Sequence, residues 1–209
     1  RGVAARYLVE EQSSFVSLGP AAVAPEVEVE KRAGALEPFE LKTYDSGARL
    51  LLQKDRRLPK VHLRCVFNGG PLYEPASQRG VTTLMAELMT KDTQSRTAQE
   101  VSELIEGIGG SFSPTVGNNT ASFAIEVLPE YLETAIVILS DALTRPIFAQ
   151  ATFDTEREAQ IADLKETDDE VLDYGFRVLR EKFFDQHPFS VNADGRIGDL
   201  ETLTREDVR

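Results

Sequence analysis

Alternation of apolar and polar residues predicts several strands in the middle of the chain. Segment 61–67 carries an apolar residue at every second position, which is typical of a half-buried strand. Segments 39–44 and 48–54 flank Asp45-Ser46-Gly47, a sequence that favours a tight turn, so together they predict a hairpin. Segments 111–116 and 120–127 predict a second hairpin.

A helical spacing of apolar residues follows in other segments. It predicts helices over residues 79–91, 97–107, 129–143, 153–165 and 171–184. The second of these begins at Thr97, and Glu100 follows three residues later, which is the pattern of a capping box. In the last of these helices, Leu172, Phe176, Leu179 and Phe183 fall on one side.

The order of these elements indicates an α+β fold. Strands occur together as hairpins and helices follow in groups, which predicts a two-layer sandwich with a mostly antiparallel sheet covered by helices. Residues 21–37 combine prolines, small residues and charges, as linkers do. Residues 1–20 therefore precede the linker, a main domain spans 38–190, and 191–209 begins a further part that is cut short at Arg209.

Net charge and the length of the apolar runs argue against two classes of partner. The chain of 209 residues carries a formal charge of −12, with no basic stripe that could neutralise phosphates, so we expect no nucleic-acid partner. Apolar runs are too short for membrane insertion. We expect a soluble protein of the bacterial cytoplasm or periplasm. The single cysteine, Cys65, lies in an apolar strand and is interpreted as a buried hydrophobic residue.

Motifs for metal binding and nucleophilic catalysis are missing from the sequence. The two histidines, His62 and His187, have no second ligand one helical turn away, whereas zinc sites need three or four convergent ligands. Acidic residues are abundant between 156 and 170, where they are typical of a solvated helix face. Glu156 and Asp163 are seven residues apart and so share one face of that helix.

Taken together, these segments resemble the M16 metallopeptidase family, which includes insulinase, pitrilysin and the mitochondrial processing peptidases. The residues that carry the resemblance are 45–50, 69–75, 80–93, 109–112, 128–130, 153–169, 187–189 and 203–208. They cover the chain from about residue 38 to its end. On this resemblance, residues 1–20 are the end of a preceding M16 half, and 191–209 begin a following M16 subdomain.

Active family members carry a His-x-x-Glu-His motif on the first helix and a distal glutamate as the third zinc ligand. The resemblance places Thr83 at the first histidine, Ala86 at the general base and Glu87 at the second histidine. Asp163 takes the distal ligand position and Glu156 an accessory acid position seven residues earlier. Because zinc needs the imidazoles and its water needs the base, we expect no metal ligands and no catalytic residues in this chain.

The resemblance implies a function without catalysis. M16 proteins pair a zinc-bearing half with a zinc-less half, in one chain or in two subunits, and the halves close as a clamshell around a peptide. This chain resembles the zinc-less half; its partner would be a zinc-bearing half, in cis or in trans, and zinc would lie there. The arginine and tyrosine that zinc-less halves lend to substrate would follow Arg209. Alternatives are a purely structural M16 homologue, like the core subunits of respiratory complexes, and an unrelated α+β binding module.

The family also binds peptide by adding it to the edge of a sheet as a further strand. The matching candidates here are Ser111, Phe112, Ser113 and Thr115. Pro114 lies among them and lacks an N–H group, so it would interrupt pairing along that edge. The sequence therefore favours a chamber wall over a strand that grips peptide.

Overall fold

The computed structural model describes residues 37–209. The predicted end of a preceding half and all but the last residue of the predicted linker lie outside these residues. The described part divides into two compact units, one ending at Arg57 and the other covering Leu58–Arg209.

The first unit contains the predicted hairpin. Strand β1 (Glu40–Thr43) pairs antiparallel with β2 (Arg49–Leu52), and Glu40 lies opposite Leu52. Gly47 in the turn has a φ angle of 83°, which a side chain rarely allows. The position and pairing predicted for this hairpin are confirmed.

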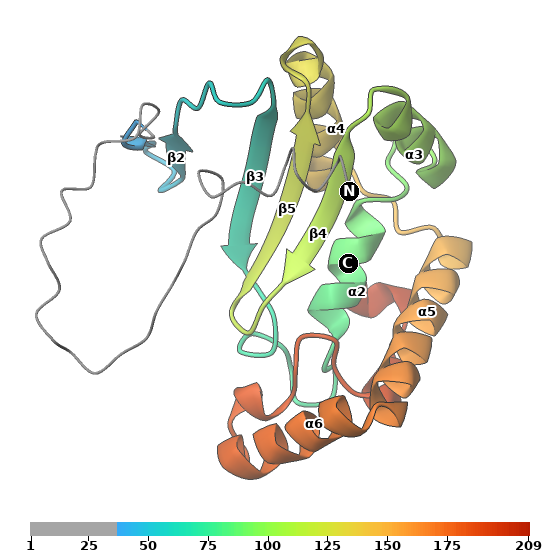
Figure 1. Cartoon of the computed structure of the whole chain (residues 1–209). Coiled ribbons are helices and arrows are strands. Elements are labelled where there is room, and N and C mark those ends of the chain that lie inside the picture. The colour runs from blue at the N-terminus through green and yellow to red at the C-terminus, as the bar shows by residue number, and fades with distance from the viewer. Residues whose placement is uncertain (1–36) are drawn as a thin grey trace, which may run out of the picture. The chain divides into compact units, whose positions relative to one another are not determined.

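The second unit is built on a three-stranded antiparallel sheet in the order β3-β5-β4 (Figure 1). The strands are β3 (Val61–Asn68), β4 (Ser111–Val116) and β5 (Thr120–Val127). Residues of β5 alternate between the faces: Phe123, Ile125 and Val127 are buried on the inner face. The outer face is polar, and Lys60 just before β3 reaches Glu126 of β5 at 2.5 Å across it.

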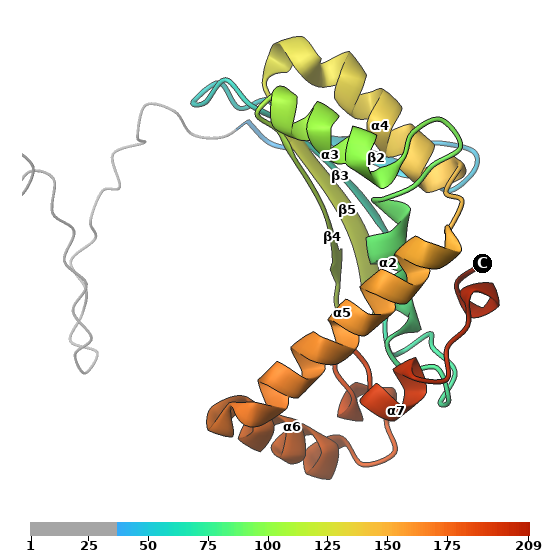
Figure 2. The same cartoon turned by 90° about the vertical axis from the view of Figure 1, so that its right-hand side faces the viewer.

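Helices α2 (Val81–Met89), α3 (Ala98–Gly107) and α4 (Leu132–Thr144) lie on the same side of this sheet (Figure 2). Their apolar residues and the inner face of the sheet form one buried cluster, composed of Ala86, Val101, Ile105, Phe123, Ile125, Val127, Ala135, Ile138 and Leu139. The predicted capping box at Thr97 is present, with hydrogen bonds in both directions to Glu100. The α+β sandwich predicted from the sequence is therefore confirmed.

A second buried cluster lies on the other side of α2. Long helix α5 (Gln150–Asp169), the short helix α7 (Ile197–Leu200) and a 3-10 turn (Arg205–Val208) pack there. The cluster consists of Leu84, Leu88, Phe148, Phe153, Leu164, Leu200, Leu203 and Val208. Residues 200–208 thus contribute to the same core as α2, and the predicted boundary near residue 191 stays a prediction.

Two apolar residues of the strand and helix patterns are about half exposed. Phe67 is 48% exposed because β3 is an edge strand and its inner face is only partly covered. Ile136 is 51% exposed because α4 packs through Ala135, Ile138 and Leu139, and Ile136 lies about 100° around the helix from Ala135. The sequence pattern therefore predicted strand β3 and helix α4 correctly, but it assigned too many residues to their buried faces.

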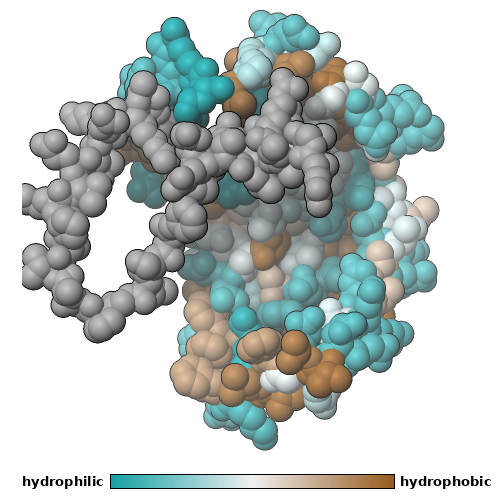
Figure 3. Space-filling model, viewed as in Figure 1, coloured by the Kyte–Doolittle hydropathy of each residue, from teal (hydrophilic) through white to brown (hydrophobic). Residues whose placement is uncertain are grey.

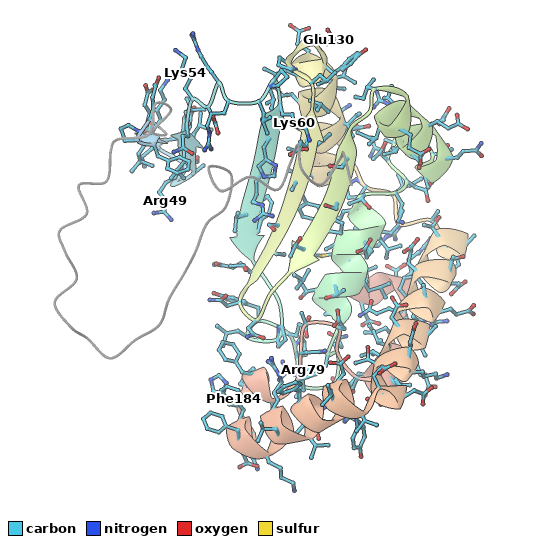
Figure 4. All side chains as sticks on the ribbon, in the orientation of Figure 1. Arg49, Lys54, Lys60, Arg79, Glu130 and Phe184 are labelled. Atoms are coloured by element: carbon cyan, nitrogen blue, oxygen red, sulfur yellow. The ribbon has the colours of Figure 1, made fainter. Side chains whose placement is uncertain are left out.

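Helix α6 (Val171–Phe184) confirms the predicted bounds but has no buried residue. The apolar side predicted for it faces outward, since Leu172, Phe176, Leu179 and Phe183 are between 61% and 77% exposed. This surface is the brown area at the bottom of Figure 3. On the same helix, Phe184, labelled in Figure 4, packs edge-to-face against Phe189 with ring centres 6.0 Å apart.

Candidate functional site

The buried carboxylate of Glu74 stabilises the start of α2. Glu74 is 8% exposed, and its two oxygens accept hydrogen bonds from the backbone N–H groups of Gly80 and Thr82, both at 3.0 Å. These are N–H groups that a helix start leaves without partners, and the negative charge suits this end of the helix. Arg79, labelled in Figure 4, holds the same loop by donating to the carbonyl oxygens of Pro71 and Glu74.

Two glycines bring a distant loop onto α2. Gly80 has a φ angle of 95° and Gly195 a φ angle of 88°. A Cβ atom on Gly195 would lie 2.2 Å from the carbonyl oxygen of Arg79, and one on Gly80 would lie 2.6 Å from that of Asp194. The two backbones therefore cross at a distance that only glycine allows.

Side chains from α2 and α5 then fasten this loop. The hydroxyl of Thr83 donates to the carbonyl oxygen of Ala193 at 2.7 Å. Gln160 of α5 donates through Nε2 to the carbonyl oxygens of Asp194 at 2.7 Å and Gly80 at 3.2 Å. Three segments that are far apart in the sequence are thus joined by direct hydrogen bonds.

These segments enclose a pocket of about 350 Å³. Its lining comprises Thr83, Glu87, Glu156, Ala159, Gln160, Asp163, Leu164, Thr167 and Asp194. Four of the five positions that the resemblance assigned to zinc chemistry therefore line one pocket. The fifth, Ala86, has no exposed surface and belongs to the buried cluster between α2 and the sheet.

Carboxylates dominate the electrostatics of this pocket. Burial raises the pKa of Glu87; Lys91 opposes the rise, and Glu156 and Asp163 add to it. Desolvation of the Asp194 carboxyl group likewise raises its pKa, and Asp163 adds to that rise too. Lys91 neutralises the carboxylate of Glu156 through an ion pair at 3.1 Å. The pocket thus carries several acidic groups, and Lys91, which lies outside its lining, pairs with only one of them.

The donor set does not fit a catalytic zinc ion. Zinc in peptidases takes imidazoles and a carboxylate, with a base for its water, and Thr83 uses its hydroxyl to hold Ala193 instead. Within residues 37–209, no group of three or more His, Cys, Asp or Glu residues is arranged to hold a metal ion. No step through zinc can be derived from these residues.

The candidate peptide-binding strand, β4, is an edge of the described sheet, since it pairs only with β5 there. Gly117 N–H donates to the carbonyl oxygen of Thr120 at 2.8 Å, which fixes the alternation of bonds along the hairpin. Following the register from that pair, Ser111, Ser113 and Thr115 bond toward β5. The backbone groups of Phe112, Pro114 and Val116 therefore point to the free edge.

Pro114 removes the middle donor of this edge. An added strand would find the N–H groups of Phe112 and Val116 but none between them. A larger hollow of about 670 Å³ borders the start of β4, where Ser111 and Phe112 line it together with parts of α3 and α5 and with the two residues that follow α2. It shares Glu156 with the acidic pocket, and Lys91, which lines only the larger of the two, pairs with that glutamate. Space for a ligand is present beside β4, but its pairing edge is interrupted.

Sequence reasoning did not find Gln160 and Asp194 of the acidic pocket. Gln160 lies four residues after Glu156 and three before Asp163, so helical spacing alone could have placed it on their face. Asp194 comes from a loop 31 residues after Asp163, and only the fold brings it to α2. The local sequence Asn192-Ala193-Asp194-Gly195 signals a turn and nothing about its neighbours.

Comparison with known proteins identifies the family. The model of the insulinase family, peptidase family M16, matches residues 49–192, which is more than half of the chain. The chain belongs to the M16 family. A protein of Rickettsia felis described as an uncharacterized zinc protease is 22% identical over 81% of this M16 chain and 41% of its own length. The β subunit of the mitochondrial processing peptidase of Saccharomyces cerevisiae is 25% identical over 68% of the chain and 31% of its own length.

Solved structures agree with this M16 assignment. A protease from Helicobacter pylori superposes with a TM-score of 0.77 at 15% identity, covering 83% of this chain and 42% of its own. An inactive M16 domain from Pseudomonas fluorescens gives a TM-score of 0.75 at 17% identity, over 81% of this chain and 42% of its own. The M16-like fold predicted from the sequence is therefore confirmed.

The chain spans less than half the length of the curated relatives it matches. None of the helices in the described part is long and apolar enough to cross a membrane.

Proposed function

We propose that this chain is a non-catalytic M16 domain that completes the chamber of a zinc peptidase, opposite a zinc-bearing half. One observation carries the proposal: Thr83, Glu87, Glu156 and Asp163 converge on one pocket, as family members' zinc ligands do, but supply neither imidazole. The fold that would build the chamber wall is retained, and the chemistry would come from the other half.

The interrupted edge of β4 supports a role as wall. A strand that grips peptide needs an unbroken row of backbone donors and acceptors, and Pro114 removes one donor from that row. The likeness to a solved inactive M16 domain and to relatives described as zinc proteases supports the same division of labour. Peptide substrate and zinc-bearing partner, in cis or in trans, are parts of this proposal.

Two measurements on the purified chain test the claim that it is not catalytic. After dialysis, elemental analysis should find far less than one zinc per chain, and a quenched fluorescent peptide of flexible sequence should stay intact. Both results are expected because Thr83 and Ala86 offer zinc and its water no ligand and no base. Stoichiometric zinc that is lost on replacing Glu87 and Asp163 would overturn it.

A reconstitution experiment tests the claim that this chain completes the chamber of a zinc peptidase. A zinc-bearing M16 half from the same source, prepared alone, should cleave the peptide about tenfold faster or more after this chain is added, because a closed chamber orients the peptide. An unchanged rate, with the two halves still associating, would favour the purely structural homologue instead.

A further inference from the structure

We propose that the pocket between α2, α5 and residues 193–195 binds the guanidinium group of an arginine side chain presented by a polypeptide. The inference rests on the proposed function only for the source of that arginine, which is a peptide inside the chamber. The binding itself belongs to this chain and can be measured on it alone.

Charge is the first reason. Lys91 pairs with Glu156, but none of the ion pairs in residues 37–209 includes Glu87, Asp163 or Asp194. Asp163 lies near enough to raise the pKa of both Glu87 and Asp194. Asp163 thus repels the carboxylates of both Glu87 and Asp194, and a cation bound between them would relieve that repulsion.

Gln160 is the second and independent reason. It lines the pocket and is 8% exposed, and its Oε1 atom has no hydrogen-bond partner among residues 37–209. The amide cannot be turned over, because its Nε2 group already donates to two backbone carbonyl oxygens, which would then face Oε1. A buried acceptor without a donor is unfavourable, so this wall of the pocket favours a ligand with N–H groups.

Guanidinium fits this combination better than a metal ion or an ammonium group. The acidic residues are not arranged to hold a metal, which needs ligands converging on one point. A guanidinium is planar, always charged and carries five N–H donors in a fan, so it can reach carboxylates on several segments and an amide oxygen at once. The pocket's volume of about 350 Å³ leaves room for the side chain that carries it.

Calorimetric titration of the purified chain at 0.15 M salt tests the proposal. Nα-acetyl-arginine amide is the ligand, and the citrulline derivative, of nearly the same shape but neutral, is its control. We expect the arginine compound to bind at least about tenfold tighter, because only it forms charge-assisted hydrogen bonds. Equal affinity for the two compounds would overturn the proposal.

Two variants locate the binding. Asp163→Asn should weaken arginine binding at least about tenfold, since it removes a charged acceptor. Glu166→Gln removes the same charge from the same helix outside the pocket lining and should leave the affinity unchanged. Both residues are exposed, so both variants should fold, which circular dichroism checks.

The remaining outcomes separate the two proposals. Equal weakening by both variants would mean general attraction to an acidic chain and would refute the pocket, as would Ca²⁺ or Zn²⁺ displacing the arginine compound at equal concentration. Failure of arginine binding together with faster cleavage in the reconstitution would refute only the pocket. Binding without any gain in cleavage would retain the pocket and refute the chamber role.

Discussion

The sides of α2 that face the two cores differ from the side that faces the pocket in how far packing constrains their residues. On the faces toward the two cores, Leu84, Ala86 and Leu88 are between 0% and 1% exposed. On the face toward the pocket, Thr83 and Glu87 are partly exposed, and Glu87 is an acid among acids. The residues on the core faces are constrained by packing. The residues on the pocket face interact with nearby groups through their polar atoms.

This difference explains how an M16 domain can keep its fold without the zinc motif. The helix is held by apolar contacts on both sides and by Glu74 at its start, none of which uses the pocket face. Substitutions on the pocket face therefore change chemistry at little structural cost.

The largest effect is expected on the core face. Leu84→Ala should reduce the free energy of unfolding by about 2–5 kcal/mol, because it leaves a cavity where the side chain is fully buried. Leu172→Ala makes the same chemical change on α6, where the leucine is 77% exposed, and should cost less than about 0.5 kcal/mol. Urea unfolding measures both, and similar losses would contradict the contrast.

The second largest loss of stability is expected where the loop at Gly195 crosses the start of α2. Gly195→Ala forces a Cβ to within 2.2 Å of the Arg79 carbonyl oxygen at a positive φ angle, so we expect a loss of about 2 kcal/mol or more. Gly198→Ala is the matched control, because nothing lies within 4 Å of a Cβ there and the residue is helical. It should be neutral or slightly stabilising. Thermal unfolding distinguishes the two.

Thr83→Val tests the tie between the pocket face and the loop. The substitution keeps the shape but removes the donor to Ala193, and it should cost about 1 kcal/mol. Thr155→Val, in α5, is the control, because its hydroxyl only donates to the carbonyl oxygen of Ala151 in the preceding turn. Proteolysis within the 191–195 loop should rise for Thr83→Val alone; unchanged protection would show that Thr83 does not hold the loop.

The smallest effect concerns Glu87 and has a defined sign. Its pKa is raised in the folded state, so the charged form disfavours folding at neutral pH, and this penalty disappears as pH falls through the folded pKa to the unfolded one. Glu87→Gln should thus stabilise the chain at pH 7 by less than about 1 kcal/mol. The gain should shrink in acid. Urea unfolding at pH 7 and near pH 4 measures it, and a loss of stability at pH 7 would contradict the sign.

The sequence predicted those parts of the fold that local patterns determine. Thr97 and Glu100 form the expected capping box because the motif acts within one helical turn. The hairpin ending in β5 was predicted from alternation and turn residues alone. Family resemblance added what no local pattern contains, namely that Thr83 and Asp163 meet although they are 80 residues apart.

Features that depend on neighbours distant in sequence were not predictable. The burial of Ala86 depends on where the sheet lies, and the place of Asp194 depends on the crossing at Gly195. The exposed side of α6 could not be distinguished from a buried one, because an apolar stripe predicts a face and not what covers it.

The burial of Ala86 limits which residues can occupy its position. A glutamate introduced at that position would lie in the apolar cluster with Val101 and Phe123, where a carboxylate is strongly disfavoured. Returning the histidines alone would not supply the base either. A carboxylate could therefore be placed at this position only after the packing between α2 and the sheet had changed.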